Sequence, residues 1–263
     1  MERIKQALER ARAERQGQPA STPTREGPAH IPAEEITYSQ TRNVDVSRTT
    51  LRRNRVITGF DPCDFTDAYK MLRTQVLQRL DENNWNVLAV TSPGSGEGKS
   101  LTALNLAASI AMEIDHTVLL VDANLRHPSL HQHLGLPDGP GLNDYLTKDT
   151  PLNELLVHPK EIEHLTFLPA GAAMLNSAEM LNSPKMTHLV DELKNRYAGR
   201  IIVFDLPPVL SAADALAFAP YVDAALLVVE EGKTSRQEVE NALDLLSSTN
   251  VLGTVLNKAG NPA

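Results

Sequence analysis

The residues with the clearest chemical use form a glycine-rich run, Thr91-Ser-Pro-Gly-Ser-Gly-Glu-Gly-Lys-Ser100, which lies between an apolar stretch and a helical pattern. Glycines let backbone N–H groups curl around an anion, and the N-terminus of the following helix adds a positive dipole end. The Lys99 ammonium would neutralise the β- and γ-phosphates of a nucleotide, and the Ser100 hydroxyl would join a Mg²⁺ shell. The run therefore predicts binding of ATP and Mg²⁺.

This run departs from the strict spacing G-x-x-x-x-G-K-[ST], because the position five before Gly98 is Pro93. The alternative is a glycine-rich turn without a ligand. A strand before the run, a helix over Leu101–Met112 after it, and the Gly-x-Gly-Lys-Ser core favour a phosphate loop. The predicted nucleotide-binding residues of the loop are Gly94, Ser95, Gly96, Glu97, Gly98, Lys99, Ser100 and Leu101.

Two apolar stretches end in a carboxylate, at Asp122 and at Asp205. In a parallel sheet such strand ends lie along the edge where a phosphate loop opens, and a nucleotide-bound Mg²⁺ is held there by few carboxylates. Each aspartate could instead cap a helix. Two acids in a chain with a phosphate loop favour metal binding, so we predict Ser100, Asp122 and Asp205 as magnesium ligands.

Phosphoryl transfer needs positioning and charge neutralisation more than covalent help. Asp122 is the better catalytic candidate of the two acids, because Asn124 and Arg126 follow it at once. Arg126 is the candidate for the arginine that stabilises the transferred group, although it could simply pair with a nearby acid. The predicted catalytic residues are Lys99, Asp122, Arg126 and Asp205.

Short apolar runs rich in Val, Leu and Ile alternate with helical patterns from residue 86 onward. Strands that do not alternate with polar residues are typical of a mainly parallel sheet covered by helices on both faces. A helix beginning near Asp64 precedes the first strand. The predicted strands are Val87–Thr91, Thr117–Asp122, Leu165–Leu168, Ile201–Asp205, Ala224–Val229 and Val251–Leu256.

The segment before residue 61 lacks the alternation of strand and helix patterns found later in the chain. Residues 1–15 have apolar positions at helical spacing and predict a short amphipathic helix, either a solvated terminus or a docking element. Residues 16–34 are rich in Pro, Gly, Ser and Thr and predict a linker, and residues 35–60 carry a small basic cluster. Residues 16–60 are therefore expected to form a linker or extended segment. The folded domain is then expected over residues 61–263.

Composition excludes some functions. The chain has 263 residues, a net charge of −8 and a single cysteine, Cys63. An acidic chain has no global attraction for nucleic acid, and one cysteine allows neither an internal disulfide nor a cysteine-rich zinc site. No apolar run approaches the roughly 20 residues needed to span a bilayer. We expect a cytoplasmic protein with no nucleic-acid partner.

With these motifs in place, the chain resembles the bacterial tyrosine kinases (BY-kinases), in particular the autokinase branch encoded with exopolysaccharide and exosortase loci. The resemblance implies a P-loop α/β domain of the partition-ATPase type. It also implies tyrosine-kinase activity and a transmembrane polysaccharide chain-length determinant protein as partner, which would place the chain at the inner face of the plasma membrane. The resembling segments are Met1–Ala11, Asp67–Arg79, Thr91–Ser100, Leu119–Pro128 and Leu256–Lys258.

The resemblance also assigns residues outside the loop. The family's helix motif Glu-x-x-Arg-x-x-Arg, which closes rings of subunits, stands here as Asp67, Lys70 and Arg73, spaced by three along one side of a helix. It implies a homo-oligomer with an exposed row of charges. Asn257 resembles the adenine-contacting asparagine of related ATPases.

Three departures from the family leave other functions open. Asn124 replaces a second aspartate, Leu206 replaces a small hydroxyl residue, and the C-terminal tyrosine cluster is missing, the last tyrosine being Tyr221. A regulator that uses ATP to switch assembly without phosphorylating is one alternative. A partition ATPase is another, although Gly94 stands where such proteins carry a signature lysine. If self-phosphorylation occurs, Tyr38 or a partner's tyrosine is the expected acceptor.

Overall fold

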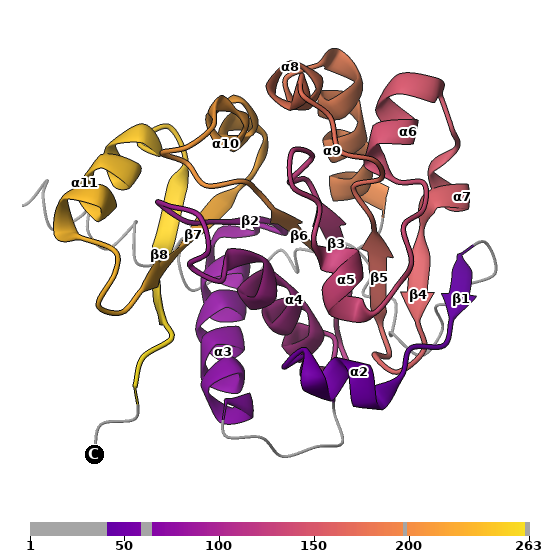
Figure 1. Cartoon of the computed structure of the whole chain (residues 1–263), viewed down its shortest axis with the longest axis horizontal. Helices are drawn as coiled ribbons and strands as arrows, with labels where there is room; N and C mark the ends of the chain where they lie inside the picture. Colours follow the sequence, from indigo (N-terminus) through magenta and orange to yellow (C-terminus); the bar gives the residue numbers. More distant parts are fainter. Residues whose placement is uncertain (1–40, 59–64, 197–198, 261–263) are drawn as a thin grey trace, which may run out of the picture. The chain divides into compact units, whose positions relative to one another are not determined.

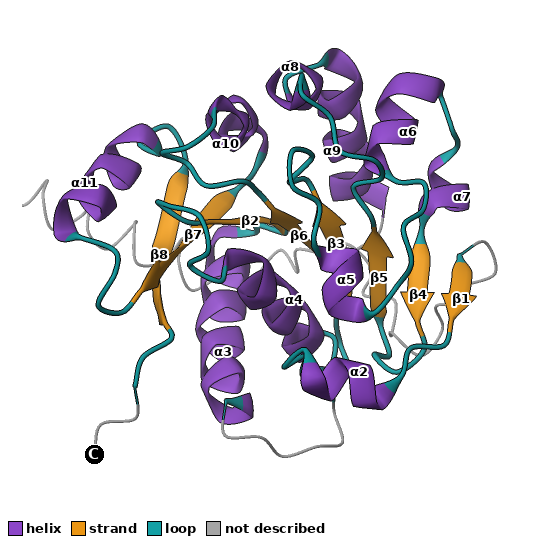
Figure 2. Ribbon diagram, viewed as in Figure 1, coloured by secondary structure: helices purple, strands orange, loops and turns teal. Residues whose placement is uncertain are grey.

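In the computed structural model, residues 41–58, 65–196 and 199–260 are described. The predicted helix over residues 1–15, Cys63 and Tyr38 therefore lie outside the described residues. The described strands form one eight-stranded sheet in the order β1-β4-β5-β3-β6-β2-β7-β8 (Figures 1 and 2). All neighbours are parallel except β4 and β5.

The six predicted strands are confirmed, with small shifts at their ends. The strands are β1 (Arg42–Val44), β2 (Val87–Thr91), β3 (Thr117–Asp122), β4 (Val157–Pro159), β5 (Leu165–Leu168), β6 (Arg200–Asp205), β7 (Ala224–Glu230) and β8 (Asn250–Asn257). The sequence reading missed β1 and β4, each of three residues, which are too short to give a period of their own.

The helices are α2 (Arg48–Arg53), α3 (Thr66–Asn83), α4 (Lys99–Ile110), α5 (Leu130–Leu134), α6 (Leu142–Lys148), α7 (Leu152–Leu155), α8 (Ser177–Leu181), α9 (Pro184–Arg196), α10 (Ala213–Phe218) and α11 (Arg236–Leu245), with a 3₁₀ turn, η2, over Ala219–Tyr221. Helices α2 to α5 cover one face of the sheet and α6 to α11 the other (Figure 1).

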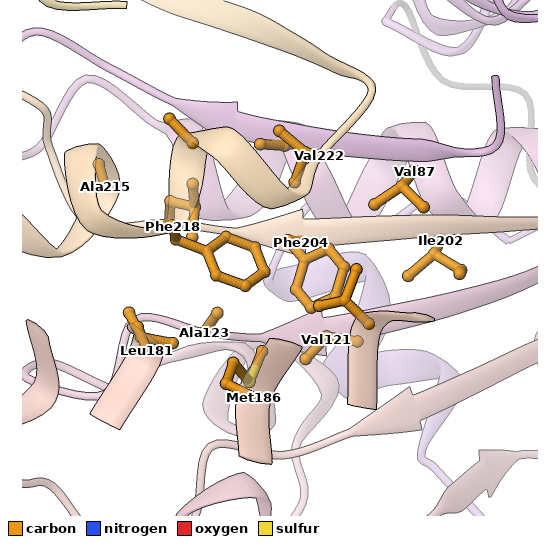
Figure 3. Packing of buried hydrophobic residues seen from close by; sticks show 14 of the residues in the cluster. Val87, Val121, Ala123, Leu181, Met186, Ile202, Phe204, Ala215, Phe218 and Val222 are labelled. Carbon is orange, nitrogen blue, oxygen red and sulfur yellow. The ribbon is translucent and has the colours of Figure 1, made fainter. Parts of the chain in front are cut away.

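Each inner strand supplies side chains to both faces. In β6, Val203 packs with the α3 and α4 side, whereas Phe204 packs with the α8 to α10 side. Figure 3 shows the hydrophobic cluster that contains Phe204 and Phe218. The centroids of these two rings lie 4.8 Å apart. Because successive residues of the inner strands β2, β3, β5 and β6 point to opposite faces and both faces are covered, these strands are apolar at nearly every position.

The predicted linker over residues 16–60 is wrong for its last part, because residues 41–58 belong to the folded domain. Leu51 and Val56 are buried against the α3 and α4 side of the sheet. The Ile57 N–H donates to Asn105 Oδ1 at 2.9 Å, and Asn105 Nδ2 donates to Arg55 O at 2.9 Å. These polar contacts come from helix α4, so the local sequence of the segment gave no sign of them.

Candidate functional site

The glycine-rich run forms the loop between β2 and α4. Gly96 and Gly98 have φ of +79° and +92°, a backbone region that side-chain-bearing residues rarely adopt. Gly98 is the N-cap of α4, so Lys99 and Ser100 open the helix at its positive end. A cavity of about 520 Å³ opens here, lined by Ser95, Gly96, Gly98, Lys99, Ser100, Leu101, Asn124, His127, Ser129, His133 and Pro208.

The two acidic strand ends are neighbours in the sheet, and Asp205 contacts the last residues of the phosphate loop, although neither aspartate lines the cavity. Strands β3 and β6 are neighbours, and Asp122 is the register partner of Asp205. Lys99 Nζ lies 3.1 Å from Asp205 Oδ1 and donates to Ser100 Oγ at 2.8 Å. Asp205 is fully buried and the Lys99 side chain is 10% exposed, so the ammonium is the nearest counter-charge in a dry site.

Asp122 is held by the backbone that follows it. Its Oδ2 accepts the N–H groups of Ser129 and Leu130, both at 3.1 Å, and its Oδ1 accepts the N–H of Asn124 at 3.2 Å. Burial, and next the charge of Asp205, raise the pKa of Asp122 from 3.8 to about 7, against the lowering effect of these bonds and of Lys99. The carboxyl therefore changes protonation near neutral pH.

The oxygen groups under the loop fit a hard divalent cation such as Mg²⁺. Within the described part of the chain, Asp205 Oδ2 is buried without a hydrogen-bond partner. A buried carboxylate oxygen in this state can be satisfied by a bound cation or a water molecule. Residues 41–58, 65–196 and 199–260 contain no cluster of three or more His, Cys, Asp or Glu able to hold a metal ion. A cation would thus depend on a hydroxyl, few carboxylates, water and phosphate oxygens, the set that Mg²⁺ uses.

Two loop residues in the predicted nucleotide-binding set lie behind the cavity instead of lining it. Glu97 is 3% exposed, and its Oε2 accepts the Gly94 N–H at 2.9 Å. Its Oε1 contacts the Thr234 hydroxyl. The Gly94 amide is therefore engaged within the loop, and Glu97 acts as a brace between the loop and the turn before α11.

Asn257 reaches the loop from the end of β8. Its Nδ2 donates to Glu97 O at 2.8 Å, and a Cβ added to Gly98 would lie 2.0 Å from the same nitrogen. The loop and the last strand are thus in close contact.

Arg126 lies at the margin of the site and does not line the cavity. Its Nε donates to Asp214 Oδ2 at 3.0 Å, and Asp214, in the first turn of α10, is fully buried. Arg126 is therefore paired with an acid, which was the alternative to its predicted role in phosphoryl transfer.

The expected exposed row on α3 is only partly present. Asp67 and Lys70 form an exposed pair at 2.9 Å. Arg73 is instead 15% exposed: it donates to Ser109 O at 3.0 Å and lies 2.6 Å from Glu113 Oε1. The prediction of an exposed Arg73 is wrong, because α3 packs against the C-terminal end of α4 and the guanidinium satisfies that end.

Sequence reasoning missed three polar residues of the cavity wall, His127, Ser129 and His133. They lie on the segment that follows Asp122 and folds back as α5. Burial lowers the pKa of His133. The signal was present in the run Arg126-His-Pro-Ser-Leu-His-Gln-His133, whose polar side chains come directly after an acidic strand end.

Comparisons with known proteins agree with this geometry. Residues 83–261 match the ParA family, described as NUBPL iron-transfer P-loop NTPase. Tyrosine-protein kinase YwqD of Bacillus subtilis is 32% identical over 79% of this chain and 90% of that protein. The succinoglycan biosynthesis transport protein ExoP of Rhizobium meliloti is 32% identical over 82% of this chain but only 28% of its own length.

Among solved structures, the VpsO kinase domain has a TM-score of 0.67 and 32% identity, with 74% of this chain and 96% of that domain covered. In the described part of this chain, no helix is both long and apolar enough to cross a membrane. The predicted P-loop fold of the partition-ATPase type is confirmed. The chain belongs to the bacterial tyrosine-kinase family of P-loop ATPases.

Proposed function

We propose that this chain binds ATP with Mg²⁺ and transfers the terminal phosphoryl group to a tyrosine hydroxyl. The observation that carries the proposal is the placement of the Lys99 ammonium at the head of α4, 3.1 Å from the buried Asp205 and open to the cavity. A buried ammonium beside glycine N–H groups at a helix N-terminus is a site for phosphate.

Each residue has a distinct task in the transfer. Lys99 and the loop N–H groups bind the phosphates. They fix the direction of the bond between the γ-phosphorus and ADP, so that an acceptor hydroxyl can approach in line with it. Ser100, Asp122 and Asp205 would hold Mg²⁺, which supplies positive charge to the phosphate oxygens. As the new O–P bond forms and ADP leaves, the acceptor loses its proton, and a carboxylate such as Asp122 is the candidate to take it. Arg126 would have to leave Asp214 to reach the phosphoryl group.

Asn257 is the candidate residue for selecting adenine over guanine in the nucleotide. Its Nδ2 donates to Glu97 O, so its Oδ1 is the atom left to accept a hydrogen bond. An amide oxygen accepts a hydrogen bond from the adenine amino group but meets an acceptor in guanine. Asn257 therefore favours ATP over GTP.

The cellular setting rests on the relatives. A succinoglycan transport protein and several tyrosine kinases share this domain. We infer that the chain works in exopolysaccharide synthesis or export with a transmembrane chain-length protein, at the cytoplasmic face of the membrane. Asp67 and Lys70, exposed on α3, remain the candidates for contact between subunits of a homo-oligomer.

The test compares Lys99→Ala with the matched control Lys160→Ala, whose ammonium makes an exposed pair with Asp45. Lys99→Ala should lose the thermal shift induced by MgATP, ATP hydrolysis and phosphotyrosine detected by mass spectrometry, whereas the control should keep all three. The shift, not the absolute Tm, is the readout, because the variant leaves Asp205 buried without its counter-charge. Full ATP-induced stabilisation of Lys99→Ala would refute the site.

A second candidate, an assembly switch driven by ATP with little phosphorylation, is favoured by the state of the described tyrosines. Burial raises the pKa values of Tyr69 and Tyr145, and the Tyr221 hydroxyl donates to Asn182 Oδ1 at 2.8 Å. A buried phenol such as that of Tyr69 is a poor acceptor for in-line transfer. Hydrolysis without phosphotyrosine, on this chain or on an added tyrosine polymer, would select this second function.

A further inference from the structure

Three consecutive carbonyl oxygens of the phosphate loop accept hydrogen bonds from side chains far along the sequence. The donors lie in the turn between β7 and α11 and at the end of β8. The pairs are Lys233 Nζ to Ser95 O at 3.1 Å, Lys258 Nζ to Gly96 O at 2.7 Å, and Asn257 Nδ2 to Glu97 O at 2.8 Å.

These bonds decide where the loop N–H groups point. In a trans peptide the C=O and the following N–H point in opposite directions. Holding the carbonyls of residues 95, 96 and 97 on the outer side therefore turns the N–H groups of residues 96, 97 and 98 towards the other side of the loop. Successive N–H groups that converge form a concave anion site, and two of these three residues, Gly96 and Gly98, line the cavity.

The two lysines are joined by one carboxylate. Glu230 Oε2 lies 3.1 Å from Lys233 Nζ and 3.0 Å from Lys258 Nζ. Hydrogen bonding to Lys258 is the main cause that lowers the pKa of Glu230. The lysine side chains are about half exposed, at 54% and 48%. Core packing therefore does not explain their placement, which is set by their bonds to Glu230 and to the loop carbonyls.

We propose that Lys233 and Lys258 are positioning residues that set the phosphate loop in its anion-binding conformation by holding its outer carbonyls. The inference rests on the proposed nucleotide site, and it concerns the loop before any ligand arrives. It adds a structural role for the turn after β7 and for the residue after β8, neither of which lines the cavity.

The experiment measures loop order and binding separately. Lys233→Met, Lys258→Met and the double variant are compared with Lys160→Met, a half-exposed lysine bonded to Asp45 at 2.8 Å. Without nucleotide, hydrogen exchange at the amides of residues 96–98 should speed up about tenfold in the double variant and not in the control. The affinities for ADP and for ATP should both fall by about the same factor, because the conformation that binds either ligand is less populated.

Two results would overturn the proposal. Unchanged exchange at residues 96–98 in the double variant would show that the loop holds its shape alone. A larger loss for ATP than for ADP, removed by high salt, would show that the lysines act by charge on the phosphates. Lys258→Arg, which keeps a donor for Gly96 O, should restore slow exchange. Failure of phosphoryl transfer in the wild type would refute the kinase proposal but leave this test intact, since ADP binding and exchange need no turnover.

Discussion

Replacing Asp122 with asparagine should stabilise the ligand-free protein at alkaline pH while removing its activity. The folded state raises the pKa of Asp122 from 3.8 to about 7. A carboxyl with a raised pKa binds more protons when folded than when unfolded, so stability is highest below the unfolded pKa. It is then lost as pH rises through the interval between the two values.

The magnitude follows from that interval. Each pKa unit corresponds to about 1.4 kcal/mol, and most of the interval lies between pH 5 and pH 7, so ionisation of this carboxyl should cost the wild type about 2–3 kcal/mol from pH 5 to pH 8. For a domain of this size the cost corresponds to a fall in Tm of roughly 5–10 °C. The Asp122→Asn variant should lack this part of the slope.

The substitution also has a cost that does not depend on pH. The amide oxygen of asparagine can keep the bonds from Ser129 and Leu130, but its NH₂ group then faces the Asn124 N–H, which costs about 1 kcal/mol. The difference in slope, and not the absolute stability, is therefore the quantity to measure.

Urea unfolding in EDTA, without nucleotide, at several pH values between 5 and 8 supplies the slope. Asp244→Asn is the matched control, because it makes the same change of charge at an exposed position. Equal slopes for Asp122→Asn and the wild type would show that Asp122 does not titrate in this range, and the account of the buried acid pair would fail.

Four further outcomes are expected. Gly98→Ala should abolish ATP-induced stabilisation, because φ is +92° and the new Cβ would lie 2.0 Å from Asn257 Nδ2; isothermal titration with ATP checks it, and wild-type affinity would contradict it. Arg73→Ala should lower the unfolding free energy by about 1–2 kcal/mol, since the guanidinium ties α3 to Ser109 O. By contrast, Lys70→Ala should reduce oligomer mass in light scattering without that loss. Tyr38→Phe should reduce self-labelling with phosphate, and undiminished labelling on tyrosine would exclude Tyr38 as the acceptor.

The sequence alone predicted the fold class, because the apolar composition of the central strands indicates that both of their faces are buried. A strand such as Val118–Val121 is apolar at every position only if both faces are covered. The loop and the acidic ends of β3 and β6 were predicted for a related reason: parallel strands bring such ends to one edge, whatever the lengths of the connections.

The features that sequence reasoning missed depend on tertiary contacts between polar groups. Arg73 was expected on the surface, but the C-terminal end of α4 offers it a carbonyl and the Glu113 carboxylate. Residues 41–58 looked like linker, yet the side chain of Asn105 bonds both Ile57 N–H and Arg55 O. Such partners lie tens of residues away and leave no period in the sequence.

The phosphate loop shows the same division within one site. Its glycines, Lys99 and Ser100 are readable from ten residues, but the orientation of its peptide groups depends on Lys233, Asn257 and Lys258, more than 130 residues later. A loop with two residues at positive φ has many conformations when unsupported, and only the one with N–H groups converging on the cavity binds phosphate. The turn after β7 and the residue after β8 therefore shape the proposed nucleotide site, and substitutions of Lys233 and Lys258 should alter affinity although neither side chain touches the ligand.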